Sequence, residues 1–531
     1  MSLVLKRAVL SLATLGVAGC LLLSNTVHAQ DKVLRVVPHA DLRVLDPFAT
    51  SIYISRYHGY MIFDTLFGMD ASGKVQPQML QSYNVSSDRL TWTFVLRDGL
   101  LFSDNTPVTG ADVVASLNRW GKKDLMGQNL FGYVSKLEAV DAKTVRMTLT
   151  APFGLVLETL GKPNSIAPFI VPKRLADGPL DKPMPELIGS GPFLFKADEY
   201  KPGEKVVYVK NAKYVPRKEP ASGLAGGKVV NVDRVEWVIL KDPQTQINAL
   251  TTGAIDILES PASEQMVALK ANPEIGLINV IKTGWSISLR FNHITPPFND
   301  IKVRQAAMLA LGQEPMLRTQ MGSPDYYKTC LSYYPCGTPL STPNNGGWVS
   351  ARPQTEKARA LLKSSGYKGE PIVLLQPTDL AMLAKAPLSA AQMLKQAGFN
   401  VDLQSMDWAT FATRRTNREV ASKGGWNVFL TIHAGSDLLN PLSHPIMAAT
   451  GDRGYYGWAT DGRTEALRTA FAMAQTDEDR KRVGEQVQLR AMEEALFYPV
   501  GLTFIPMAVR KAAVSGLIEG QMPVFWGVRK Q

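Results

Sequence analysis

Apolar and polar residues alternate in the stretch 90–114, which reads LTWTFVLRDGLLFSDNTPVTGADVV. Trp92, Phe94 and Leu96 occupy every second position, and this period of two predicts a strand with one buried face. Residues 98–102 begin with the turn signal Asp-Gly and return to apolar residues, so we expect them to resume the strand as a hairpin.

The same stretch ends in a helix signal. Thr109 and Asp112 have the spacing of a capping box, with Asp in place of the usual Glu, and Val113 and Val114 follow directly. The order strand, turn, helix is therefore predicted within about 25 residues.

Similar patterns recur along the chain. Strand patterns lie at residues 33–38, 145–149, 235–240 and 285–292; helix patterns lie at residues 55–66, 244–252, 303–310, 355–365, 389–397 and 477–497. The strand-helix-strand order through residues 235–258, with Gly253 ending the helix, predicts an α/β fold. A chain of 531 residues is too long to fold around a single hydrophobic core, so two or three domains are expected.

The distribution of charge along the chain argues against nucleic-acid binding. The formal net charge is +11, with 20% charged and 45% hydrophobic residues. The densest runs of basic residues are short, such as residues 480–482. They are better explained as solvent-exposed ends of helices than as a surface that contacts the phosphates of a nucleic acid. We therefore expect no nucleic-acid partner.

The N-terminus reads as an export signal. Lys6 and Arg7 precede an apolar run, and the segment 27–29, Val-His-Ala, fits cleavage before Gln30. A lipobox-like segment ending at Cys20 is the alternative and would give a lipoprotein. Either reading predicts a periplasmic protein, and no later stretch has 18 uninterrupted apolar residues.

Two cysteines remain after the signal segment, Cys330 and Cys336. An even pair at short spacing in an oxidising compartment predicts a local disulfide. A zinc site would need further ligands, and no other His or Cys lies nearby. We predict no metal and no cofactor.

Several segments together resemble family 5 of the extracellular solute-binding proteins, the dipeptide- and oligopeptide-binding subunits of ABC importers. The segments that carry the resemblance are residues 45–47 (LDP), 90–114, 188–193 (IGSGPF), 244–258, 296–310 (PPFNDIKVRQAAMLA) and the surroundings of residue 437.

The resemblance implies a two-lobed, Venus-flytrap α/β fold of the large three-domain type. Domain I would comprise residues 30–78, 189–290 and 505–531, domain II residues 79–188, and domain III residues 291–504. The lobes would close on the ligand about hinges near residues 289–292 and 503–506.

The implied role is to capture a di- or oligopeptide and deliver it, as a monomer, to a membrane permease driven by an ATPase. Opines, oligosaccharides, nickel chelates, haem or glutathione are alternative ligands within the same role. An exported hydrolase is a further alternative; against it, the G-S-G-P at residues 189–192 differs from G-x-S-x-G, and H-E-x-x-H is absent from the sequence.

Three candidate ligand residues follow from the resemblance. Asp437 lies where the family has an aspartate that receives a peptide ammonium, although a local Asx turn explains it equally. Trp408 resembles a pocket-wall tryptophan, with core packing as the alternative. Arg415 lies where a carboxylate-binding arginine can occur, but Arg414 is adjacent and the register is open.

Four further candidates come from residue type and position. Tyr455 and Trp458 lie in a glycine- and aromatic-rich loop, and Trp285 lies beside the expected hinge. His433 could contact a ligand or a metal, whereas a lone histidine is more often structural. Each could equally serve packing.

Overall fold

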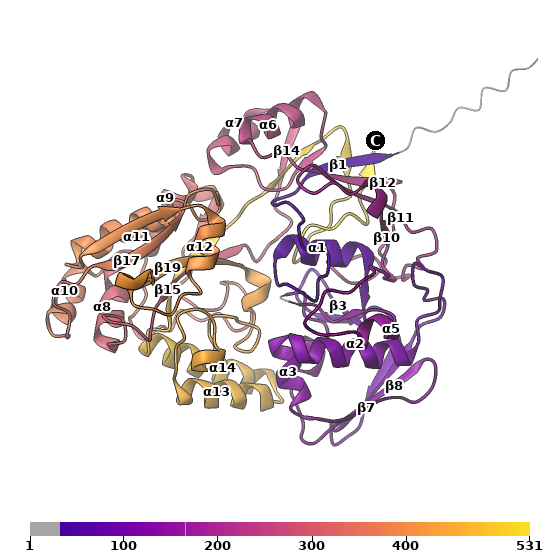
Figure 1. Cartoon of the computed structure of the whole chain (residues 1–531), viewed down its shortest axis with the longest axis horizontal. Helices are drawn as coiled ribbons and strands as arrows, with labels where there is room; N and C mark the ends of the chain where they lie inside the picture. Colours follow the sequence, from indigo (N-terminus) through magenta and orange to yellow (C-terminus); the bar gives the residue numbers. More distant parts are fainter. Residues whose placement is uncertain (1–31, 165) are drawn as a thin grey trace, which may run out of the picture. The chain divides into compact units, whose positions relative to one another are not determined.

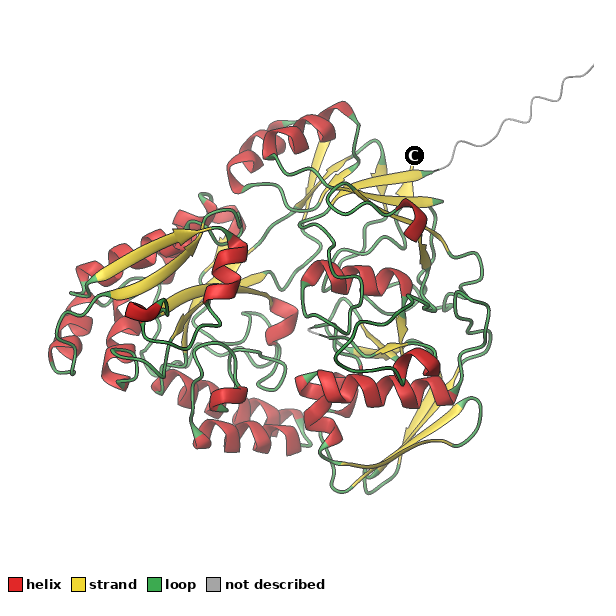
Figure 2. Ribbon diagram, viewed as in Figure 1, coloured by secondary structure: helices red, strands yellow, loops and turns green. Residues whose placement is uncertain are grey.

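A computed structural model describes residues 32–164 and 166–531 (Figure 1). The predicted signal segment and Cys20 lie outside the described residues. The described chain forms two lobes of mixed helices and strands (Figure 2). We call residues 32–278 and 507–531 the first lobe, and residues 285–503 the second lobe.

The first lobe is organised around a seven-stranded sheet built from distant parts of the chain. Its order is β10 (Phe193–Phe195), β11 (Lys205–Lys210), β12 (Arg234–Val238), β1 (Val33–Val37), β13 (Ile257–Leu258), β21 (Met507–Arg510) and β14 (Ile275–Ile278). Strand β1 runs parallel to both β12 and β13.

A four-stranded antiparallel sheet lies in the same lobe, in the order β5 (Leu80–Val85), β6 (Thr91–Leu96), β8 (Thr144–Leu149) and β7 (Val134–Ala139). Two-stranded pairs join β2 (Asp64–Thr65) to β9 (Phe169–Ile170), β3 (Phe67–Met69) to β4 (Val75–Pro77), and β22 (Val514–Ser515) to β23 (Arg529–Lys530). The helices of this lobe are α1 (Tyr53–Ile62), α2 (Gly110–Lys123), α3 (Leu125–Phe131), α4 (Val156–Leu160), α5 (Lys173–Ala176), α6 (Pro243–Thr252) and α7 (Met266–Ala271).

The second lobe holds a six-stranded sheet. Its order is β16 (Tyr327–Lys328), β20 (Phe497–Thr503), β15 (Trp285–Phe291), β19 (Val428–Ala434), β17 (Ile372–Pro377) and β18 (Val401–Met406). The helices of this lobe are α8 (Ile301–Ala310), α9 (Gln313–Met321), α10 (Thr355–Lys363), α11 (Ala386–Gln396), α12 (Trp408–Arg414), α13 (Gly462–Met473) and α14 (Asp477–Glu493).

The chain crosses between the lobes twice, at residues 279–284 and 504–506. The crossings lie side by side, because a Cβ added to Gly284 would meet the Thr503 carbonyl oxygen at 2.9 Å and the Phe504 ring at 2.8 Å. Gly284 also has a φ of 66°, which glycine adopts without strain. The hinge predicted at residues 289–292 is therefore wrong, because residues up to Phe291 belong to a strand inside the second lobe.

The opening stretch of the sequence folds largely as its pattern predicts. Helix α2 begins at the expected capping box, where the Thr109 amide donates to Asp112 Oδ2 at 2.8 Å. The predicted hairpin is wrong: β6 pairs with β5 and β8, and residue Leu101 forms only an isolated bridge with Pro107. Strand β6 pairs instead with the strand just before it, β5, and with the later strand β8.

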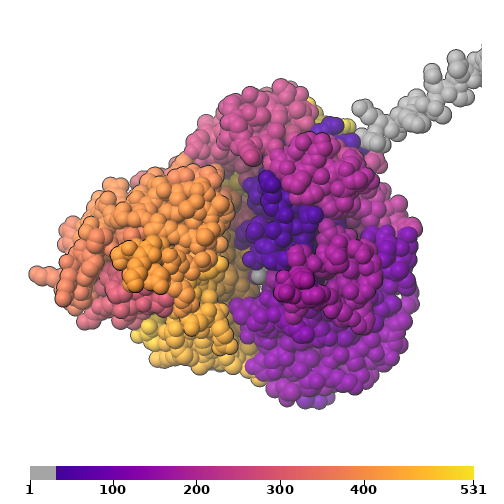
Figure 3. All heavy atoms as spheres, viewed as in Figure 1, coloured from indigo at the N-terminus to yellow at the C-terminus, as the bar shows by residue number. Residues whose placement is uncertain are grey.

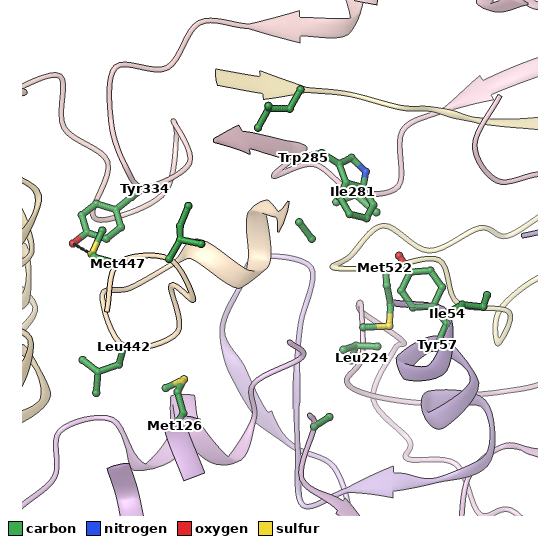
Figure 4. Packing of buried hydrophobic residues seen from close by; sticks show 14 of the residues in the cluster. Ile54, Tyr57, Met126, Leu224, Ile281, Trp285, Tyr334, Leu442, Met447 and Met522 are labelled. Carbon is green, nitrogen blue, oxygen red and sulfur yellow. Dashed lines mark hydrogen bonds between the residues drawn. The ribbon is translucent and has the colours of Figure 1, made fainter. Parts of the chain in front are cut away.

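The hydrophobic core extends through both lobes (Figure 4). One cluster of buried residues includes Met126 of the first lobe together with Trp285, Leu442 and Met447 of the second. The predicted disulfide between Cys330 and Cys336 is present in the second lobe.

Candidate functional site

The parallel strands of both sheets end in polar residues. In the first lobe, His39 follows β1 and Glu259 follows β13, and the His39 ring nitrogen Nδ1 lies 2.8 Å from Glu259 Oε1. In the second lobe, Trp408 follows β18 and Asp437 follows β19, whose strands both run parallel to β17. Ligands of open α/β sheets bind outside the carboxyl ends of such strands, so these ends are the candidate site.

A hollow separates the two lobes on the face drawn in Figure 3, between the orange segments of the second lobe and the indigo segment of the first. Helix α1 of the first lobe and helix α12 of the second flank this hollow in Figure 1.

Asp437 connects the lobes through helix α1. Its carboxylate accepts a hydrogen bond from the Tyr53 hydroxyl at 2.7 Å and one from the Arg56 guanidinium at 3.2 Å. The side chains of Arg56 and Asp437 are only 4% and 9% exposed. Burial and the charge of Asp437 raise the pKa of Tyr53 well above its usual value, so the phenol stays protonated and donates.

Arg56 is held at this place by more than the carboxylate. Its guanidinium also donates to the carbonyl oxygen of Pro163 at 3.1 Å and lies 4.3 Å above the Tyr53 ring. Burial acts to lower the pKa of Arg56, but Asp437 and the neighbouring tyrosine side chains together outweigh burial, and the pKa is raised. The guanidinium is therefore charged, and its main counterion is Asp437.

A partly open cavity of about 690 Å³ lies next to this ion pair and is lined by residues that contact it. Its lining includes Pro163 and Asn164 of the first lobe and Ser436 of the second. The Asn164 amide also donates to the backbone oxygen of Asp437 at 3.3 Å, which joins the cavity wall to the ion pair.

Strand β19 has a free edge beside Asp437. On one side it pairs with β15 along its whole length, from Val428 to Ala434. On the other side it pairs with β17 only at Val428 and Phe429. The amide of Ala434 donates instead to the Tyr53 hydroxyl at 2.9 Å, which shows that the backbone at this end points toward the first lobe. The backbone of residues 430–433 on this side has no strand partner among the described residues and is therefore a template for an added strand.

Aromatic side chains and one arginine form a wall beyond this edge. The Arg415 guanidinium lies 5.4 Å from the Trp408 ring and 4.9 Å from the Tyr456 ring. It also donates to the Tyr455 hydroxyl at 3.3 Å, and this hydroxyl lies 3.3 Å from the Thr431 hydroxyl. Among residues 32–164 and 166–531, no carboxylate lies within 4.0 Å of Arg415, so its charge is open to an anionic group.

The geometry distinguishes the two adjacent arginines. Arg414 donates to the carbonyl oxygens of Gly424 and Gly425, at 3.2 and 3.1 Å, and so holds a local loop. Arg415 alone joins the aromatic wall.

Two of the remaining candidates lie near Asp437. Trp285 packs edge-on against Tyr53, with ring centroids 5.1 Å apart. His433 is buried, its ring lies 5.9 Å from that of Tyr455, and burial lowers its pKa to about 4. A neutral imidazole at pH 7 acts as a hydrogen-bonding group rather than as a cation.

Trp458 takes a different position. It is buried in a core cluster with Trp426, at 5.8 Å between rings, and the Arg418 guanidinium covers it at 4.6 Å. These contacts are those of a packing residue, the alternative that the sequence left open.

Sequence reasoning missed Arg56 and Tyr53. A signal was present, because Arg56 is the only charged residue in the apolar and aromatic helix YISRYHGYMI. A charge on a helix that is buried on most sides needs a partner, and an acid elsewhere in the chain could have been sought on that ground.

The comparisons with known proteins agree with this geometry. The sequence profile of the bacterial extracellular solute-binding proteins, family 5 (middle), matches residues 74–454. The chain belongs to family 5 of the bacterial extracellular solute-binding proteins. The family predicted from the sequence and its two-lobed α/β fold are thereby confirmed.

Individual relatives cover most of the chain. A probable peptide ABC transporter periplasmic-binding protein of Sinorhizobium fredii is 37% identical over 512 residues, 96% of each chain. A glutathione-binding protein of Pectobacterium atrosepticum is 28% identical over 432 residues, 78% of each chain. A PBP of A. tumefaciens R10, solved in complex with agropinic acid, has a TM-score of 0.78 at 24% identity and covers 94% of this chain and 99% of its own.

Two further features of this solute-binding protein concern membranes and metals. None of the helices in the described ranges is long and apolar enough to cross a membrane. Within the same ranges, no group of three or more His, Cys, Asp or Glu side chains is placed to hold a metal ion.

Proposed function

We propose that this protein is the periplasmic substrate-binding subunit of an ABC importer and that it captures a short peptide or a peptide-like solute between its lobes. The family and the name of the Sinorhizobium relative support the transport role. Export would use the predicted signal segment at residues 1–29, with lipidation at Cys20 as the alternative. The loaded form would then deliver its ligand to a permease driven by a separate ATPase.

The free edge of β19 is the observation that carries the choice of a peptide. A peptide in an extended conformation offers backbone donors and acceptors at the spacing of a strand, and can add to an unpaired edge. Residues 430–433 present that edge, and it runs between Asp437 and the aromatic wall. A sugar or a metal chelate has no such repeat.

The wall supplies the remaining contacts that a peptide needs. Trp408 and Tyr455 offer apolar surface, and Arg415 offers a cation without a resident carboxylate. We assign the carboxylate end of the solute to Arg415, because buried or half-buried carboxylates need a paired cation.

The division into domains remains part of the proposal. Because β15 belongs to the sheet of the second lobe, the boundary expected at residue 290 moves to residue 284. Domain I would take residues 30–78, 189–284 and 505–531, domain II residues 79–188, and domain III residues 285–504. Closure would turn about the crossings at residues 279–284 and 504–506.

Binding can be tested on the purified mature protein by thermal shift and calorimetry with a defined tripeptide mixture, with opines and oligosaccharides as comparison ligands. Peptides should raise the melting temperature, because a ligand that binds only the folded state stabilises it. Mass spectrometry of the recovered peptides should show them intact, whereas cleaved peptides would favour the hydrolase. If no peptide stabilises the protein, the proposed ligand class is wrong.

The two adjacent arginines provide a matched pair of variants. Arg415→Gln should weaken peptide binding by about tenfold or more, since a charge-assisted hydrogen bond contributes about 1.5–3 kcal/mol. Arg414→Gln should leave affinity unchanged, because its partners are the carbonyls of a local loop. Equal losses of peptide affinity in both variants would mean that Arg415 does not bind the ligand.

A further inference from the structure

The carboxylate that the family resemblance assigns to a peptide ammonium already has a resident cation. Asp437 receives the Arg56 guanidinium on Oδ1 and the Tyr53 hydroxyl on Oδ2, and both donors come from the same helix of the opposite lobe. The hydroxyl of Ser436 lies 3.5 Å from Oδ1 as well. The charge of Asp437 is therefore compensated from within the protein.

An ammonium group at this place would meet a carboxylate whose charge is already compensated. Arg56 is 4% exposed and cannot move into water while the lobes stay together. Lys162 is also buried near the pair, but Asp124 is its counterion, so Lys162 offers no free charge to a ligand. Two cations sharing one buried carboxylate leave one charge unpaired, which is costly in a desolvated site.

The cavity beside the pair has room and polar groups for something else. It measures about 690 Å³, far more than an ammonium group requires. Three lining side chains have buried oxygens without a hydrogen-bond partner anywhere in the described part of the chain: Asn164 Oδ1, Thr283 Oγ1 and Gln521 Oε1. Asn164 and Gln521 are 3% and 7% exposed.

The charged lining of the cavity is mainly basic. Its cationic side chains are Lys74, Lys162, Lys282, Arg480 and Lys481, and its acidic side chains are Glu158 and Asp477. Arg480 pairs with Glu158 at 3.1 Å, Lys282 with Glu519 at 2.9 Å, and Lys162 with Asp124. The basic excess therefore comes from the exposed Lys74 and Lys481, which have no acidic partner within 4.0 Å among the described residues. A group that enters here is thus better matched if it is neutral or acidic.

We propose that the protein selects peptide-like solutes whose amine end is blocked by an acyl group, and that the acyl group lies in the cavity beside the Arg56–Asp437 pair. This inference rests on the proposed function and names the class of peptide-like solute. An N-acyl amide carries no charge, so it can pass the compensated Asp437 without leaving Arg56 unpaired. The basic lining then favours an acyl group that ends in a carboxylate.

A competition experiment on the wild-type protein tests the class directly. The mature protein is incubated with one defined tripeptide mixture supplied in equal amounts with free, acetylated and succinylated amine ends, and the retained peptides are identified by mass spectrometry. We expect acetylated forms to be retained at least tenfold over free forms, and succinylated forms at least threefold over acetylated forms. Retention of none of the three would overturn the proposed function itself.

The other outcomes overturn only the present inference. Retention of free forms equal to or above acetylated forms means that a ligand ammonium displaces Arg56 from Asp437. Equal retention of succinylated and acetylated forms would mean that the acyl group does not bind in the basic cavity. Because these outcomes still require bound peptide, they are distinct from a failure of peptide binding.

Variants of Arg56 give an independent test of the cause. Arg56→Gln frees Asp437, so the preference should reverse toward free amine ends, whereas Arg56→Lys keeps a cation and should keep the wild-type order. Circular dichroism establishes that each variant is folded, and the wild-type competition decides the proposal even if Arg56→Gln fails to fold. A folded Arg56→Gln protein that still prefers acetylated peptides would refute the role of Arg56.

Discussion

Replacing Asp437 by Asn should open the protein in the absence of ligand. The change keeps the size of the side chain and an oxygen that can accept from Tyr53, but it removes the charge that Arg56 faces at 3.2 Å. Removing one partner of a buried ion pair costs about 3–5 kcal/mol, because the other charge stays desolvated. The variant therefore destabilises the closed conformation relative to the open one, because Arg56 becomes hydrated once the lobes separate.

The magnitude is large for an equilibrium between closed and open lobes. A cost of about 3–5 kcal/mol corresponds to a shift of more than about a hundredfold toward the open state, at 1.4 kcal/mol for each factor of ten. Small-angle X-ray scattering of the ligand-free mature protein should therefore give a larger radius of gyration for Asp437→Asn than for the wild type.

The double variant Arg56→Gln/Asp437→Asn is the control. It removes both charges, so no unpaired charge remains and the wild-type scattering should return. If Asp437→Asn scatters and melts as the wild type does, then Arg56 is not held by Asp437, and the argument from a buried pair fails.

Three further predictions concern other buried groups. Lys228→Met should lower the free energy of unfolding, measured by urea titration, by about 3–5 kcal/mol. The reason is that the fully buried Asp64, which receives Lys228 Nζ at 2.8 Å, loses its only ion-pair partner among the described residues. Lys270→Met, at an exposed ion pair, should change the free energy of unfolding by less than about 1 kcal/mol. Cys330→Ser should cost about 2 kcal/mol in urea unfolding, since the disulfide closes a loop with a separation of 6 residues, and dithiothreitol should give the same loss in the wild type. Burial lowers the pKa of His58 to about 3, so His58 binds a proton at higher pH in the unfolded chain than in the folded protein. The free energy of unfolding should therefore fall as the pH drops below about 6.5. His58→Phe should make this fall less steep, and an unchanged pH dependence would contradict a neutral buried histidine.

The sequence predicts most of the local structure. Helix α2 begins at the capping box of Thr109, and Gly253 ends α6 with a φ of 81°, because both signals depend on residues a few positions apart. The disulfide follows for the same reason, from two cysteines at short spacing. Family resemblance extended these local signals to the two-lobed fold.

The centre of the site could not be predicted in this way. Arg56 and Asp437 are 381 residues apart, and no spacing in the chain shows that they meet. The same holds for β15, whose alternating pattern predicted one buried face: β19 and β20 flank it, and every residue from Trp285 to Phe291 is buried. Pairing between distant segments decides both features.

The place of β21 in the first sheet has a consequence for how the chain is made. This strand comes from residues 507–510, yet it lies between β13 and β14, which are complete by residue 278. Until the last residues of the chain arrive, β13 and β14 present unpaired edges, and the whole second lobe must be synthesised in between. Such late, long-range pairing is slow, and open edges favour aggregation. We expect the seven-stranded sheet of the first lobe to stay incomplete until residues 507–510 have been made.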